Sequence, residues 1–161
     1  MNIVKVKMAD LNTVKAPDRI RTTGLGSCVG IVLYDKVNQI GGLAHIMLPS
    51  SDIMKTEQIN MAKYADTALP LLMEEMIKAG AKKIHIIAKL AGGSQMFQFK
   101  TTNDMMKVGP RNVAASKEWL NKLGIPIVAE DTGGNVGRTI ELDTLTGMVS
   151  VKTAQQGVTE I

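Results

Sequence analysis

Apolar and polar positions follow a strand-like rhythm in the first third of the chain. Residues 2–8 alternate loosely with a period of two, which predicts a strand, whereas the polar, proline-containing residues 9–18 predict a loop. The Val- and Ile-rich run 28–34 predicts a buried strand, and turn residues at 35–38 connect it to a second apolar run at 41–48. The pattern therefore predicts a hairpin made of 28–34 and 41–48.

Helical spacing replaces this alternation further along. Apolar residues recur at helical spacing over 57–79, and Gly80 is a natural stop. Pro70 predicts a kink or a break within this helix, because proline lacks a backbone donor and clashes with the preceding turn. Pro110 suits the first turn of a second helix, which ends at Gly124.

Further strands are expected around and after the second helix. Residues 84–88 read as a central strand and 126–130 as a short one, and 139–142 with 148–152 predict a second hairpin. Alternation of this kind indicates an α/β fold with two main helices and a mixed, largely antiparallel sheet.

Length and composition favour one compact unit. With 161 residues, 45% of them hydrophobic, the chain fills one core, so we expect a single domain over 1–161 with 155–161 as a loose tail. Only 3% of residues are aromatic, so the eleven methionines must do part of the packing.

Charge and cysteine content restrict the compartment and the partners. One cysteine excludes an intramolecular disulfide, and no secretory leader or bilayer-length apolar run is present, so we expect a cytoplasmic protein without membrane insertion. The net charge of +4 is spread evenly, with no basic run interleaved with aromatics, which argues against nucleic-acid binding. No apolar surface helix demands a dimer, and we expect a monomer.

Cys28 and His45 are the strongest candidates for chemistry. A thiolate is the active form of cysteine, and a thiol with a pKa of about 8.5 usually needs an imidazole beside it. The predicted hairpin places Cys28 at the start of one strand and His45 on the next, where a shared face would bring thiol and imidazole together. Thr22 or Thr23 could orient the imidazole. The alternative is that Cys28 is simply a small buried hydrophobe, as free cysteines usually are.

Other motifs carry less chemistry. Gly24-Leu25-Gly26 lacks the third glycine and the helix of a dinucleotide fingerprint, and the later glycine pairs lack a phosphate-loop ending. One cysteine and two histidines without zinc-ligand spacing predict no metal site, and no cofactor is expected. His85 lies far from Cys28 in sequence, and we interpret it as structural.

Six motifs in order over nearly the whole chain resemble the CheD family of chemoreceptor glutamine deamidases. They are Thr-Thr-Gly-Leu-Gly-Ser-Cys-Val-Gly at 22–30, Gly-Leu-Ala-His-Ile-Met-Leu-Pro at 42–49, Lys-Tyr-Ala-Asp-Thr-Ala at 63–68, Ala-Gly-Gly at 91–93, Gly-Pro-Arg-Asn at 109–112 and Glu-Asp-Thr-Gly-Gly-Asn at 130–135. The resemblance implies a single-domain αβ sandwich similar to that of the deamidating cytotoxic necrotizing factor toxins. It also implies a cysteine hydrolase with Cys28 as nucleophile, His45 as base and Thr22 as third member.

The same resemblance implies partners. The substrates would be glutamine side chains of methyl-accepting chemotaxis receptors, converted to glutamate with release of ammonia through a cysteine thioester. Some members also bind CheC, a phosphatase of phosphorylated CheY. Two alternatives remain open from the residues themselves: a docking module that regulates receptors or CheC with little or no chemistry, and another thiol reaction, proteolysis or acyl transfer, at the same pair.

Overall fold

A computed structural model describes residues 1–52, 59–95 and 107–161. Within them, ten strands form two five-stranded sheets, accompanied by two α-helices and one 3₁₀ turn. The outer sheet has the order β1(Ile3–Val6), β3(Arg19–Leu25), β8(Arg138–Asp143), β9(Val149–Thr153), β10(Gly157–Glu160). The central sheet has the order β2(Asp10–Lys15), β5(Ile40–Ile46), β4(Val29–Asp35), β6(Ile86–Gly92), β7(Ile127–Thr132). The helices are α1(Ala65–Lys78) and α2(Val108–Lys122).

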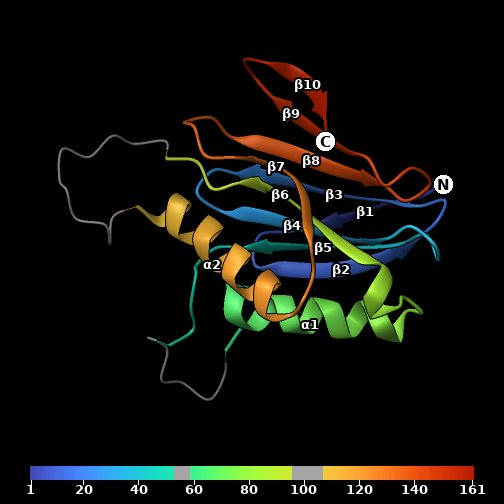
Figure 1. The fold of residues 1–161 in the computed structure, drawn as a ribbon. Helices are drawn as coiled ribbons and strands as arrows, with labels where there is room; N and C mark the ends of the chain where they lie inside the picture. The colour runs from blue at the N-terminus through green and yellow to red at the C-terminus, as the bar shows by residue number, and fades with distance from the viewer. Residues whose placement is uncertain (53–58, 96–106) are drawn as a thin grey trace.

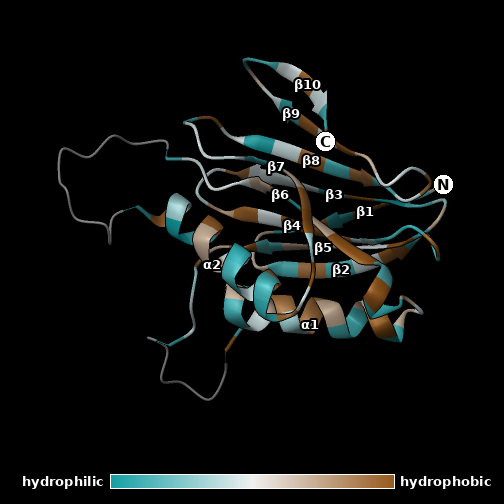
Figure 2. Ribbon diagram, in the orientation of Figure 1, coloured by the Kyte–Doolittle hydropathy of each residue, from teal (hydrophilic) through white to brown (hydrophobic). Residues whose placement is uncertain are grey.

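The molecule has three layers, in which both helices cover one face of the central sheet and the outer sheet covers the other (Figure 1). Every residue of β4 and β5 is buried, because these middle strands are covered on both faces. Figure 2 shows apolar colour along β4, with polar colour on the exposed sides of the helices. The predicted α/β sandwich is confirmed, with its strands divided between two mixed sheets.

Successive residues of β5 face opposite layers. A Cβ on Gly42 would meet Leu72 of α1, whereas one on Gly41 would meet Leu142 of β8. Odd-numbered positions of β5 therefore point at the outer sheet and even-numbered ones at the helices. His45 is an odd position, so its ring lies between the two sheets.

The hairpin predicted from 28–34 and 41–48 is confirmed, as β4 and β5 pair antiparallel. The loop predicted at 9–18 is wrong over Asp10–Lys15, which form β2. This strand is the edge of the central sheet and pairs with β5, so its polar residues face solvent and hide the strand pattern.

The helix predicted over 57–79 is shorter than expected. It begins at Ala65, since Met47 and Leu48 donate backbone hydrogen bonds to the Lys63 carbonyl and hold the preceding chain against the end of β5. Residues 57 and 58 lie outside the described ranges. Pro70 sits in the second turn of α1, which continues as one helix to Lys78, so of the kink or break expected there the break does not occur.

Other boundaries move by a few residues. The strand expected at 84–88 begins at Ile86, because a 3₁₀ turn takes up Lys83–His85. The second hairpin, now β8 and β9, is confirmed. Within 155–161, where the sequence suggests a loose tail, Gly157–Glu160 pairs with β9 as β10.

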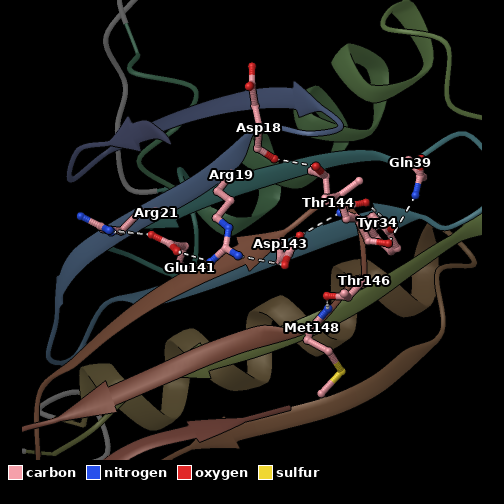
Figure 3. A network of polar contacts seen from close by, with 11 residues as sticks. Asp18, Arg19, Arg21, Tyr34, Gln39, Glu141, Asp143, Thr144, Thr146 and Met148 are labelled. Atoms are coloured by element: carbon pink, nitrogen blue, oxygen red, sulfur yellow. Dashed lines mark hydrogen bonds and ion pairs between the residues drawn. The ribbon is translucent and has the colours of Figure 1, made fainter. Parts of the chain in front are cut away.

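Polar contacts fix the two sheets at the end where β3 begins (Figure 3). The guanidinium of Arg19 donates to Glu141 and to Asp143, at 3.1 Å in each case, across the β3–β8 pair. The Tyr34 hydroxyl of β4 donates to the Thr144 carbonyl at 2.7 Å, linking the central sheet to the turn after β8. These contacts hold β3, the strand that carries Thr22, against β8, and hold the turn after β8 against the central sheet.

Candidate active site

Thr22 and His45 meet between the sheets. Thr22 lies on β3 of the outer sheet and His45 on β5 of the central sheet, and both are buried. The Thr22 Oγ1 is 2.6 Å from the His45 Nδ1 and 2.8 Å from the carbonyl oxygen of Val6 on β1. The structure thus brings together two of the three residues that the resemblance assigns to the site.

This geometry fixes the tautomer of His45. The Thr22 hydroxyl has one proton, and the Val6 carbonyl can only accept, so the hydroxyl donates to Val6. The same oxygen must then accept from His45, which places the ring proton on Nδ1. Nε2 is left as the free, basic nitrogen, and it has no hydrogen-bond partner among the described residues.

Burial keeps the imidazole neutral. His45 has no exposed surface, and this loss of hydration lowers its pKa from 6.5 to about 4. The ring is therefore an unprotonated base throughout the neutral range.

Cys28 lies immediately before β4, on the same inter-sheet face as His45. The ladder pairs Gly30 with His45, so Cys28 is displaced from the ring by two residues along the neighbouring strand. Such diagonal neighbours have Cα atoms about 7–8 Å apart, within reach of longer side chains. The thiol belongs to the inter-sheet cluster with Leu25 and Ile140.

The surroundings of the Cys28 thiol favour its protonated form. Burial raises the pKa of Cys28, opposed in part by its own backbone N–H. The thiol does not hydrogen-bond to His45 Nε2 in this structure. Contacts of this kind are often long in substrate-free enzymes and tighten when substrate binds.

A bulge shapes the chain between Thr22 and Cys28. The β3–β8 register shifts between Thr22 and Leu25, and Gly24 adopts a φ of +74°, a conformation that favours glycine. Pairing with β8 resumes at Leu25, where β3 ends, and the chain then crosses to the central sheet, whose strand β4 begins at Val29. Thr22 and Cys28 therefore lie close in sequence but on different sheets.

His85 takes no part in this arrangement. It lies in the 3₁₀ turn before β6, where its Nδ1 is 3.7 Å from the buried carboxylate of Asp35. Asp35 ends β4, whereas Cys28 precedes the start of that strand, so the two histidines are at opposite ends of the sheet.

A groove of about 490 Å³ opens beside Thr22, between β1 and β3. Lys5, Lys7, Met8 and Arg21 contribute to its walls. A larger hollow of about 680 Å³ lies over β3, β8 and β9, and neither Cys28 nor His45 lines either hollow. Of these two hollows, only the smaller groove is lined by Thr22.

No group of three or more His, Cys, Asp or Glu side chains lies close enough to hold a metal ion within the described ranges. Neither α1 nor α2, the α-helices of those ranges, has the length and apolar character needed to cross a membrane.

Comparison with known proteins identifies the family. A Bacillus velezensis protein named chemoreceptor glutamine deamidase CheD is 55% identical over 159 residues, covering 99% of this chain and 96% of the relative. The family model described as CheD chemotactic sensory transduction matches residues 47–153. The chain belongs to the CheD family. Relatives of the same name from Bacillus subtilis and Halalkalibacterium halodurans are 55% and 56% identical over 96% and 99% of this chain, covering 93% and 99% of the relatives.

A solved structure shares the fold of this CheD family member at low identity. Neisseria meningitidis protein NMB0706, family-model DUF152, aligns with a TM-score of 0.52 and 10% identity, covering 84% of this chain and 65% of that one. This likeness concerns the fold alone.

Proposed function

We propose that this chain deamidates glutamine side chains of chemoreceptors, with Cys28 as nucleophile, His45 as base and Thr22 as the group that orients the base. The names of its relatives support the reaction and the substrate class. The observation that carries the assignment of roles is the Thr22–His45 hydrogen bond, because it leaves the basic Nε2 of a neutral imidazole on the face that also holds the thiol.

The chemistry follows from these protonation states. The free pair is a neutral thiol and a neutral imidazole, so Nε2 takes the thiol proton as the sulfur attacks the carboxamide carbon. The C–N bond of the tetrahedral intermediate then breaks, and the imidazolium gives its proton to the departing ammonia. Water hydrolyses the resulting thioester, with His45 as base once more, and releases a glutamate side chain and the free thiol.

Backbone N–H groups at Cys28 are the proposed donors to the oxyanion. The carbonyls of Gly26 and Cys28 accept from Ser94 and Gly93, at 2.9 and 2.8 Å, which fixes the peptide planes of this loop. Within the described part of the chain, the N–H groups of Ser27 and Cys28 donate to no backbone carbonyl. Loss of one such donor typically lowers the rate by a hundredfold or more.

Incubation with a purified receptor cytoplasmic fragment tests the proposal. We expect ammonia release together with the mass gain that marks conversion of a carboxamide to a carboxylate, and neither with Cys28→Ala. A wild-type protein that binds the fragment without converting it would refute the enzyme and favour a docking module. Cleavage of the fragment would favour proteolysis instead.

A further inference from the structure

The buried face of α2 is polar where it meets the site. Its buried residues are Gly109, Asn112, Ser116 and Leu120, at the spacing of a single helical stripe. Such stripes are normally apolar, and a fully buried asparagine is uncommon unless its amide has partners. The partners of Asn112 show what this residue does.

Asn112 bridges the two segments that carry the thiol and the base. Its Nδ2 donates to the carbonyl of Ser27 and to the carbonyl of Met47, at 2.9 Å in each case. Ser27 immediately precedes Cys28, and Met47 follows His45 by two residues. One side chain of α2 thus binds both the segment that precedes Cys28 and the segment that follows His45.

The bridge stands where the strand ladder ends. The last paired residues of β4 and β5 are Val29 and Ile46, so the next rung would join Cys28 to Met47. Cys28 and Met47 do not pair, so the two chains separate there and leave a gap between Ser27 and Met47, which we call the fork. The Asn112 amide lies in this fork. The distance between the Ser27 and Met47 backbones across the fork therefore affects the distance from the Cys28 thiol to the strand that carries His45.

Three successive carbonyls of the loop 26–28, which we call the nucleophile loop, accept hydrogen bonds, and Asn112 donates to the middle one. The carbonyls of Gly26 and Cys28 accept from backbone N–H groups of the segment after β6, whereas that of Ser27 accepts from the side chain. Of these three contacts, only the one made by Asn112 also binds the chain just after β5, at Met47. It therefore adds to the β4–β5 ladder a second connection between the loop and the chain that follows His45.

Only a carboxamide suits this position. Both acceptors are carbonyl oxygens, and a primary amide places two N–H donors on one nitrogen. An aspartate of the same shape has no donor, and the reverse orientation of the amide would set three acceptor oxygens against one another. The chemistry of the partners fixes the orientation of the Asn112 amide.

Close packing sets the depth of the helix. A Cβ on Gly109 would lie 2.7 Å from the Gly93 carbonyl oxygen and closer still to that of Ser94. The first turn of α2 thus rests on the same segment that binds the nucleophile loop. Asn112 follows three residues later, on the same face of the helix.

We propose that Asn112 is a positioning residue, whose side-chain amide sets the separation between the Cys28 loop and the His45 strand. The proposal rests on the proposed deamidase function. It assigns Asn112 no contact with the substrate.

The test compares Asn112→Ser with Ser116→Ala in the purified full chain. A serine at 112 cannot span the fork but can donate to a helix carbonyl, as Ser116 does to the Asn112 carbonyl at 2.7 Å. Ser116→Ala removes that buried hydrogen bond one turn away and leaves the fork intact. The pair therefore separates loss of positioning from loss of helix stability.

We expect Asn112→Ser to lower kcat for the receptor fragment by about a hundredfold with KM within about threefold of wild type, because small displacements of reacting groups have such effects. Without receptor, iodoacetamide should alkylate Cys28 faster than in Ser116→Ala, because the released loop exposes the buried thiol. Equal kcat values in the two variants, or a raised KM with kcat retained, would overturn the proposal.

Two further arms keep the test decisive. If wild type releases no ammonia, the proposed function fails, while the alkylation comparison still tests whether Asn112 positions the Cys28 loop. If Asn112→Ser does not fold, proton exchange of the Asn112 side-chain amide is measured in wild type by NMR. Slow exchange of both protons supports the bridge, and rapid exchange refutes it.

Discussion

Acidification from pH 6.5 to pH 4 is expected to destabilise the protein by as much as about 3 kcal/mol through His45 alone. In the unfolded chain this imidazole binds a proton near pH 6.5, whereas burial lowers its pKa in the folded protein to about 4. The unfolded state therefore binds the extra proton as the pH falls through this window. Each unit of pKa difference is worth about 1.4 kcal/mol, which gives the ceiling.

The sign follows from the depressed pKa. The stability associated with the neutral ring is fully present above pH 6.5 and is lost as the pH falls toward 4. Urea unfolding of wild type and His45→Gln over this range isolates the contribution, because the other titrating groups cancel in the difference. The two free energies of unfolding should converge as the pH falls.

Parallel curves for wild type and variant would refute the reasoning. An NMR titration gives a second check, since the chain has only two histidines and His85 is partly exposed. A His45 ring that titrates near pH 6.5 would show that the site is hydrated and that the neutral-pair mechanism is wrong.

Three further outcomes are expected. Thr22→Val should lower kcat about a hundredfold and the free energy of unfolding by about 1–3 kcal/mol, because it leaves the His45 Nδ1–H and the Val6 carbonyl without a buried partner. Thr22→Ser keeps the hydroxyl and should restore both kcat and stability. Unchanged kcat in the valine variant would exclude an orienting role. Deamidation should persist at pH 5.5, with its acid limb near the depressed His45 pKa; an acid limb near 6.5 would contradict this. Gly92→Ala should impair activity more than Gly124→Ala, because both glycines have positive φ but only a Cβ at 92 would collide with the Cys28 carbonyl; equal activities would contradict the contact.

The sequence predicts the half of the site that is local. The runs around Cys28 and His45 form a hairpin with a short turn, so strand period and turn residues suffice to place them on neighbouring strands. The same reasoning misses β2 and β3 entirely. These strands obtain their pairing from distant segments, and their polar residues follow solvent exposure rather than an obvious alternation.

The other half of the site depends on how the layers stack. The role of Thr22 comes from the resemblance to the family, because spacing alone leaves Thr22 and Thr23 equivalent. The structure distinguishes them, as the side chain of Thr22 is buried between the sheets and that of Thr23 is exposed. Asn112 gives only a weak sequence signal, because it is a polar residue in the buried stripe of a helix. Its role becomes evident only from its contacts with the Ser27 and Met47 carbonyls.

The crossing of the chain between the two sheets has a consequence for the newly made protein. Thr22 and His45 belong to different sheets, so a chain in which only one sheet has formed has no oriented base. Cys28 in such a chain is an ordinary thiol. Under the proposed function, reactivity toward glutamine therefore appears only when the two sheets have packed together, and an incompletely folded copy cannot deamidate its neighbours.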